Sequence, residues 1–143
     1  MSTKFELTIS RTIPAPRKQV FEAWLCPEAL VQFMKPMEGT TVPKAEVDAR
    51  EGGKFLIVMG VGEKELPHRG EYKTINRYDR LSFSWLSEYS IPQSLVTLDF
   101  REISETETEI TLHHAGFPSE ESRNNHEGGW GTILDTLIAH ITA

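Results

Sequence analysis

The stretch NNHEGGWGTILDTLIAHI, residues 124–141, combines the pattern of an amphipathic helix with three glycines. Apolar residues recur in it at i, i+3, i+4, i+7, i+8 and i+11, which is typical of one face of a helix: Trp130, Ile133, Leu134, Leu137, Ile138 and Ile141. A glycine inside a helix costs about 1 kcal/mol relative to alanine. We therefore predict that the helix begins or bends around Trp130, with a close approach at Gly129 and the Trp130 ring turned inward. The alternative is a helix that starts only near Gly129, after an ordinary loop that contains the glycines.

Residues 4–13 and 42–115 alternate between polar and apolar side chains, as strands do. Turn signals interrupt the second region at residues 50–53, 61–65, 77–80, 87–92 and 104–107, which divides it into about six strands. Because these turns are short, neighbouring strands must pair antiparallel. Such a sheet is apolar on one face, and only the C-terminal helix, at roughly residues 119–141, is long enough to cover it.

Prolines divide the segment between the first strand and this region into two short helices. Pro16 suits a first helical position, and the apolar face of that helix ends near Cys26. Pro27 can start the second helix, and Pro36 ends it because the residue before a proline avoids helical geometry. We therefore predict an α+β fold in which a curved antiparallel sheet of about seven strands wraps around the long C-terminal helix, with two short helices after the first strand.

Length and composition narrow the class of protein. The 143 residues suit one domain with a single core, and we predict one domain over residues 1–143. The net charge of -6, with scattered lysines and arginines, disfavours a nucleic-acid partner. The single cysteine fits a reducing compartment, the first residues lack the apolar core of a signal peptide, and the longest apolar run, residues 55–61, is too short to span a bilayer. We expect a cytoplasmic protein without membrane insertion, either a monomer or a homodimer.

The predicted architecture favours a hollow between sheet and helix. A strongly twisted sheet cannot stay in contact with a straight helix along its whole length, so large side chains fill the space or a cavity remains. Aromatic walls with a few polar groups are also typical of a small-molecule pocket. The candidate ligand-cavity residues are Phe33, Met59, Tyr72, Phe83, Trp85, Leu98, Phe100, Leu112, His114, His126, Trp130 and Leu134.

The histidines do not form a recognisable metal motif. The stretch HEGGW, residues 126–130, has Trp130 where a zinc protease needs its second histidine. His113 and His114 are adjacent on a predicted strand and point to opposite faces, so they cannot bind one ion together. His114 is predicted to face inward, either as a hydrogen-bonded core residue or as a partner for a ligand. His126 is interpreted as a polar residue near the helix start. We assign no catalytic residue, no metal site and no cofactor.

Longer stretches of the chain resemble a known family. RTIPAPRKQVFEAWLCPEAL (11–30), GEYKTINRYDRLSFSW (70–85) and HEGGWGTILDTL (126–137) are similar to the START-like superfamily, specifically to the C-terminal domain of the activator of the heat-shock protein 90 ATPase. The resemblance implies a helix-grip fold with a central apolar cavity. Relatives bind lipids, sterols, polyketides or other hydrophobic molecules, some cyclase-like relatives are enzymes, and the eukaryotic activators bind the chaperone. The chain departs from many members at Phe33, where they carry a tryptophan.

Three functions follow from this reading. The first is a non-catalytic binding module that holds an apolar or amphipathic small molecule, such as a lipid, in the central cavity. The second, implied by the resemblance, is a chaperone-linked or stress-related interaction protein whose outer face contacts a chaperone partner. The third is a cyclase-like or hydrolase-like enzyme, which would require an inward acid–base group such as His114.

Overall fold

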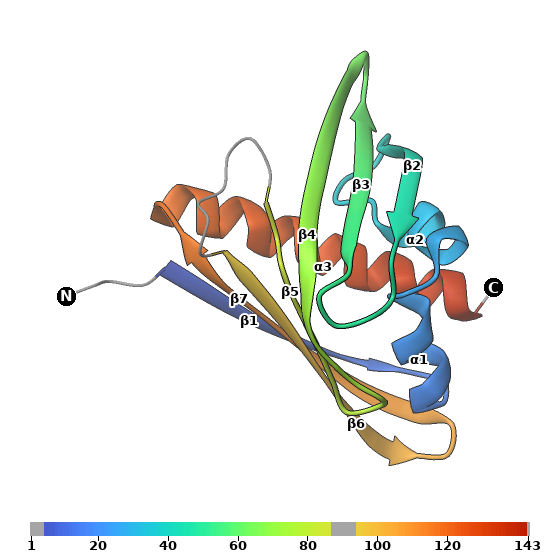
Figure 1. Ribbon diagram of the computed structural model, residues 1–143. Coiled ribbons are helices and arrows are strands. Elements are labelled where there is room, and N and C mark those ends of the chain that lie inside the picture. Colours follow the sequence, from blue (N-terminus) through green and yellow to red (C-terminus); the bar gives the residue numbers. More distant parts are fainter. Residues whose placement is uncertain (1–4, 87–93, 143) are drawn as a thin grey trace.

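The computed structural model describes residues 5–86 and 94–142, and the predicted turn at residues 87–92 lies outside these ranges (Figure 1). The element order is β1 (Phe5–Ile13), α1 (Arg17–Ala23), α2 (Pro27–Phe33), β2 (Thr41–Val47), β3 (Lys54–Val61), β4 (Lys64–Asn76), β5 (Arg80–Ser84), β6 (Leu95–Ser104), β7 (Glu107–Phe117) and α3 (Glu120–Thr142). The strands form one 7-stranded sheet in the order β1-β7-β6-β5-β4-β3-β2, and every neighbouring pair is antiparallel.

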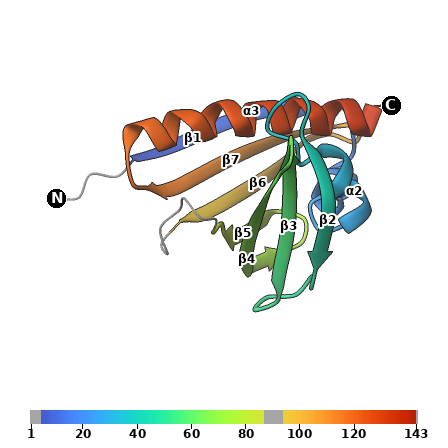
Figure 2. The same ribbon diagram turned by 90° about the horizontal axis from the view of Figure 1, so that it is seen from above.

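The sheet curves around one side of α3. Figure 2 shows α3 lying alongside β1 and β7, whereas β3 and β4 swing away from it. The short helix α2 packs against both β2 and α3 and so occupies the wedge that this divergence opens. The predicted architecture, a curved sheet with two short helices after the first strand and a long C-terminal helix, is confirmed. No helix among the described residues combines the length and the apolar character needed to cross a membrane.

Alternation along the strands builds the core, as predicted. On β7, Ile110, Leu112 and His114 are fully buried at every second position. Their partners in register on β6 are Phe100, Leu98 and Val96, which are buried on the same face. The apolar face of the sheet therefore forms one continuous layer beneath α3, which contributes the buried side chains of Trp130, Ile133, Leu134 and Leu137.

Prolines bound the two short helices as predicted, except that Pro16 lies one position earlier in its helix than predicted. Pro27 starts α2 as predicted, and the helix ends at Phe33, before Pro36. Pro16 is not the first helical residue: it is the N-cap of α1, with φ -61° and ψ 149°. Its extended backbone still lets its carbonyl accept the first helical hydrogen bond, from the Val20 amide at 3.1 Å.

The C-terminal helix is continuous from Glu120 to Thr142, which confirms the predicted range of roughly residues 119–141. A helix start near Trp130 or Gly129, which the glycines suggested, is wrong. Ser119 directly precedes the helix, and its Oγ accepts a hydrogen bond from the Ser122 amide at 3.1 Å. Glu120 and Glu121 in the first turn favour this end because carboxylates interact well with the positive end of the helix dipole. The glycines are therefore interior, and the burial of one helix face outweighs their low helix propensity.

Two of these glycines lie against other elements. A Cβ added at Gly129 would lie 3.2 Å from the Pro36 Cβ, and one added at Gly131 would lie 3.4 Å from Arg11 Nη2. A Cβ added at Gly128 would have no neighbour within 4 Å. The predicted close approach at Gly129 is therefore present, and it lets the segment after α2 pack directly on α3. The Trp130 ring turns inward as predicted and is only 2% exposed.

We expect Gly129→Val to lower the free energy of unfolding by more than ~2 kcal/mol, because the branched side chain would overlap Pro36. Gly128→Val is the matched control, since it makes the same change of helix propensity one residue away in open space. It should be neutral or slightly stabilising, by a few tenths of a kcal/mol. Urea unfolding of both variants measures the difference. Equal stability of the two variants would show that Gly129 is not held against Pro36.

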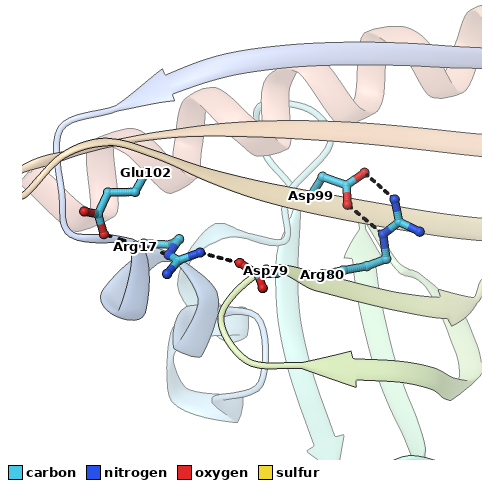
Figure 3. Close-up of polar contacts among 5 residues, drawn as sticks. All are labelled: Arg17, Asp79, Arg80, Asp99 and Glu102. Atoms are coloured by element: carbon cyan, nitrogen blue, oxygen red, sulfur yellow. Dashed lines mark hydrogen bonds and ion pairs between the residues drawn. The ribbon is translucent and has the colours of Figure 1, made fainter.

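Ion pairs attach α1 to the rest of the sheet. Figure 3 shows Arg17 at the start of α1 between Asp79, in the turn after β4, and Glu102 on β6, with the Arg17 Nε–Glu102 Oε1 distance at 4.0 Å. In the same view Arg80 Nε donates to Asp99 Oδ1 at 2.7 Å across β5 and β6. The two Arg17 pairs are partly exposed, and each contributes less than about 1 kcal/mol. The main effect of the Arg17 pairs is to fix the position of α1 relative to the sheet.

Candidate ligand cavity and adjoining histidine cluster

A small apolar cavity lies between the short helices and strands β3 to β5. Its volume is about 10 Å³, enough for about one water molecule. The end of α1, α2 with the residue after it, and the apolar face of the sheet all contribute to its wall. The lining residues are Trp24, Leu30, Met34, Phe55, Ile57, Tyr72, Phe83 and Trp85.

Aromatic rings pack tightly on the sheet side of this cavity. The Phe55 ring lies 5.4 Å from both the Tyr72 and the Phe83 ring, measured between centroids, and 6.0 Å from Trp85. Gly70 is the cross-strand partner of Phe55 and has no side chain, so the Phe55 ring covers its Cα. A Cβ added at Gly70 would lie 2.4 Å from the Phe55 Cζ. The glycine therefore makes room for the central ring of the wall.

Very few polar groups reach this region. Trp24 is 3% exposed, and its Nε1 is buried with no hydrogen-bond partner among residues 5–86 and 94–142. Burial, with a smaller effect of the Asp48 charge, raises the pKa of the Tyr72 phenol, which is therefore neutral at physiological pH. The lining contains no carboxylate, ammonium or guanidinium group. Such a site is suited to uncharged molecules.

The structure brings only part of the predicted set together around the cavity. Tyr72, Phe83 and Trp85 line it. Other predicted residues are buried elsewhere in the core, and their part in ligand binding stays a prediction: Phe33, Met59, Leu98, Phe100, Leu112, His114, Trp130 and Leu134. His126 is only partly buried. Phe33 packs edge-on against Trp24, with the ring centroids 5.0 Å apart, and so lies behind a lining residue.

Sequence reasoning missed Trp24, Leu30, Met34, Phe55 and Ile57 as lining residues. Leu30 and Met34 lie four residues apart between Pro27 and Pro36, where the second short helix was predicted, so the signal for burial on one helix face was present. Phe55 and Ile57 alternate within the apolar run at residues 55–61. What these patterns do not contain is the position of α2 over the sheet, which decides which buried residues face a gap.

A second buried group lies between β7 and α3. His114 is fully buried, and both of its ring nitrogens are hydrogen-bonded. Trp130 Nε1 donates to His114 Nδ1 at 2.9 Å, while Ser94 Oγ lies 2.7 Å from His114 Nε2. Because an indole nitrogen only donates, Nδ1 must be the acceptor, and the neutral ring carries its proton on Nε2. His114 therefore donates to Ser94.

This tautomer decides the chemistry of the Ser94–His114 pair. A histidine that activates a serine must accept the hydroxyl proton, yet here His114 donates its own proton to the hydroxyl. Burial, together with smaller effects of His126 and His113, lowers the pKa of His114 to about 3. The ring is therefore neutral and has no free basic nitrogen. Of the two roles predicted for an inward His114, the contacts support the hydrogen-bonded core residue.

The remaining histidines lie around this group. His113 points to the opposite face of the sheet, as predicted, with its Nε2 2.6 Å from Glu6 Oε1. His126, in the second turn of α3, donates from Nδ1 to the Ser122 carbonyl at 2.8 Å. No group of three or more His, Cys, Asp and Glu side chains within the described ranges is placed to hold a metal ion. These contacts account for His113 and His126 as local structural residues.

His68 was not among the predicted site residues. It connects the histidine group to the cavity wall. It pairs in register with Ile57, and its ring stacks on Trp85 with centroids 5.0 Å apart. Burial lowers the pKa of His68 to about 4. Trp85 in turn lies 5.0 Å from the Trp130 ring, again between centroids. Trp85 is therefore held between His68 and Trp130 while it contributes to the cavity wall.

These depressed pKa values predict a stability that depends on pH. A histidine in the unfolded chain titrates near 6.5, whereas His68 and His114 titrate at about 4 and about 3 in the folded protein. The unfolded state therefore binds more protons than the folded state below pH 6.5. The contribution of both residues to the free energy of unfolding is complete above pH 6.5, and it is lost as the pH falls towards their pKa values in the folded protein. At pH 5 we expect a loss of about 2 kcal/mol from each residue.

Urea unfolding at pH 7 and pH 5 measures this loss. His68→Phe keeps a ring against Trp85 but cannot titrate, so its loss between the two pH values should be smaller than that of the parent by about 2 kcal/mol. His140→Gln, which changes an exposed histidine in the last turn of α3, is the control and should leave the pH dependence unaltered. An unchanged pH dependence in His68→Phe would mean that His68 is not kept neutral by burial.

A curved antiparallel sheet that grips a long C-terminal helix, with an apolar cavity at the diverging end, defines a START-like helix-grip protein. The chain belongs to the family described as Activator of Hsp90 ATPase homolog 1-like protein, whose model matches residues 14–142. The family resemblance predicted from the three sequence stretches is thereby confirmed. None of the curated proteins matches the chain at a significant level.

Solved structures show the same fold at low sequence identity. A protein from Chromobacterium violaceum is 23% identical, with a TM-score of 0.86 over 94% of this chain and 95% of that one. The AHSA1 protein from Silicibacter pomeroyi is also 23% identical, with a TM-score of 0.80 over 96% of this chain and 97% of that one. An HSP90 activator from Plasmodium falciparum is 20% identical, with a TM-score of 0.74 over 96% of both chains.

Proposed function

We propose that the protein is a non-catalytic binding module that holds an apolar or amphipathic small molecule in the cavity between the short helices and the sheet. The observation that carries this proposal is the lining itself, which is aromatic and aliphatic and contains no ionisable acid or base except the neutral Tyr72. Pockets of this composition bind ligands by excluding water from apolar surface. The inward His114 carries no free basic nitrogen, which favours binding over acid–base catalysis.

Ligand entry requires the wall to move, because about 10 Å³ does not hold an organic molecule. The mobile part of the wall in this proposal is α2, which carries Leu30 and precedes Met34. It has seven residues and no side-chain hydrogen bond at its N-cap. So short a helix depends on tertiary contacts for its stability. Outward movement of α2 enlarges the cavity without breaking the sheet.

The experiment uses N-phenyl-1-naphthylamine, an uncharged hydrophobic fluorophore, as the probe. We expect saturable binding at one site per chain, with a change in the emission of Trp85, which lines the cavity. Ile57→Phe places a larger side chain in the lining and should weaken binding at least about tenfold, or about 1.4 kcal/mol. Ile138→Phe is the control, because Ile138 is only partly buried on α3 and does not line the cavity; its affinity should match the parent.

Native mass spectrometry of the purified protein provides an independent test, since a co-purified apolar adduct would identify the natural ligand directly. Absence of saturable binding by the probe, or equal weakening by Ile57→Phe and Ile138→Phe, would contradict the proposed site. In the second case the probe would be binding to exposed apolar surface.

A second candidate function is a chaperone-linked interaction. It is favoured by the family of the chain and by its structural similarity to an HSP90 activator from Plasmodium falciparum. In this case an outer face binds the chaperone, and the cavity serves the fold alone. Addition of the purified protein to an Hsp90 ATPase assay tests it: a concentration-dependent, saturable change in the hydrolysis rate supports the interaction, and an unchanged rate together with no co-elution contradicts it.

A further inference from the structure

We infer that Trp24 selects the ligand of this cavity, by donating its indole N–H to an uncharged molecule that carries a hydrogen-bond acceptor such as a ketone, ester or ether oxygen. This inference rests on the proposed function of the cavity. It adds the chemical class of the ligand and the residue that determines it.

The first observation is the state of the Trp24 nitrogen. Only 3% of the Trp24 surface is exposed, and its Nε1 has no hydrogen-bond acceptor within the described part of the chain. Trp130 shows the usual arrangement in the same protein, because its equally buried N–H donates to His114. Buried donors without a partner are rare in proteins because folding removes them from water without replacing the lost hydrogen bond. The Trp24 N–H is therefore available to donate a hydrogen bond to an acceptor on a bound ligand.

The second observation is the chemistry around Trp24. The other lining side chains are hydrocarbons, a thioether, the Trp85 indole and the Tyr72 phenol, and none of them accepts a hydrogen bond from Trp24. The lining also has no cation that could balance a buried anion, so a carboxylate or phosphate is disfavoured. A neutral molecule with one acceptor oxygen satisfies both conditions.

The third observation is that Trp24 is also held in place by contacts other than its packing on α2. It is the C-cap of α1, and α1 is joined to the turn after β4 by Arg17 with Asp79 and by Glu22 with Arg77. Its amide donates to the Phe21 carbonyl at 3.2 Å. When α2 moves outward to admit a ligand, the donor can therefore stay in position. A fixed donor in an apolar wall orients a ligand and distinguishes it from a hydrocarbon of the same shape.

The test compares cyclohexanone with methylenecyclohexane, which have nearly the same shape but differ in the acceptor oxygen. Affinities are measured by displacement of N-phenyl-1-naphthylamine. We expect the parent protein to bind the ketone at least about tenfold more tightly. Trp24→Phe keeps a ring but removes the donor, so it should reduce ketone binding to the level of the alkene while alkene binding changes less than about threefold. Ketone titration should also shift the Trp24 indole N–H resonance of the parent downfield, and alkene titration should not.

The outcomes separate this inference from the proposed function. Equal binding of both probes to the parent, or an unreduced ketone preference in Trp24→Phe, would overturn the role of Trp24 and leave ligand binding by the cavity intact. Binding of neither probe would overturn both. If Trp24→Phe does not fold, the indole resonance of the parent still decides the matter: a downfield shift with the ketone alone supports the inference, and its absence at saturation overturns it.

Discussion

Replacing Gly70 with alanine is expected to lower the free energy of unfolding by more than ~3 kcal/mol, although the change adds a single methyl group. A Cβ at this position would lie 2.0 Å from the backbone carbonyl oxygen of Ser84 and 2.5 Å from the Phe55 Cε2. The Phe55 ring can rotate away, but the Ser84 carbonyl belongs to β5 and cannot move without disturbing the pairing of β4 with β5. The cavity wall and the sheet are thus both built around this one glycine.

Urea unfolding of Gly70→Ala measures the effect, and Gly60→Ala on the neighbouring strand β3 is the matched control. A Cβ at Gly60 would meet Thr41 Oγ1 at 2.6 Å, but this atom is the end of a side chain that can rotate. We expect the control to lose no more than about 1 kcal/mol. A double variant, Phe55→Leu with Gly70→Ala, should remain as unstable as Gly70→Ala, because the backbone contact persists. A Gly70→Ala protein within ~1 kcal/mol of the parent would show that β4 and β5 are not this close.

The fold was predictable because its main determinants are local patterns. Alternation in residues 4–13 and 42–115 shows which side chains face the core, and short turns leave only antiparallel pairing. The place of the three glycines inside α3 was not predictable in the same way. Three interior glycines weigh against a helix by about 3 kcal/mol in propensity, and we interpreted them as its boundary. Tertiary burial of Trp130, Ile133 and Leu134 reverses that balance, so the helix extends over the range of roughly 119–141 that its length predicted.

The candidate site was predictable only in part, because a cavity depends on how elements diverge in space. Period-two alternation correctly places Tyr72, Phe83 and Trp85 on the inner face of the sheet. It places Leu98 and Leu112 on the same face, but these two residues lie in the filled part of the core and do not line the cavity. The location of the gap follows from the curvature of β3 and β4 away from α3. His68 gave no signal, since a single histidine between Pro67 and Arg69 does not stand out from an ordinary polar edge.

The same limit applies to the polar groups. Sequence alone indicates that Trp24 and Trp130 are buried in amphipathic helical segments, and it treats them alike. In the structure the Trp130 N–H has a partner, and the Trp24 N–H has none among the described residues. His114 on β7 reaches Trp130, whereas the cavity that Trp24 lines has a wall of apolar groups, the Trp85 indole and the Tyr72 phenol. Hydrogen-bond satisfaction is a property of the assembled core, so no spacing rule reveals it.

The second large effect is expected for Trp130→Ala, which should destabilise the protein by ~3 to 5 kcal/mol. The Trp130 ring is 2% exposed and packs 5.0 Å from the Trp85 ring, between centroids. Its removal leaves a cavity beneath the middle of α3, and it also leaves His114 Nδ1 as a buried acceptor without its donor. Both losses act on the same contact between α3 and the sheet, so they reinforce each other.

Two further variants separate these contributions. Trp130→Phe keeps most of the apolar volume but removes the indole donor, and it should lose about 1 to 3 kcal/mol, mainly through the unpaired His114 nitrogen. Trp130→Phe combined with His114→Phe removes both partners of the hydrogen bond, so its loss should be smaller than the sum of the two single losses. Ile103→Ala, at a side chain that is 42% exposed, is the control and should change stability by no more than about 0.5 kcal/mol. These variants and His114→Phe alone, five in all, are compared by urea unfolding at pH 7, where His114 is neutral in the folded state. A loss below ~1 kcal/mol for Trp130→Ala would mean that α3 is held by its other apolar residues and that the Trp130–His114 contact only orients the ring.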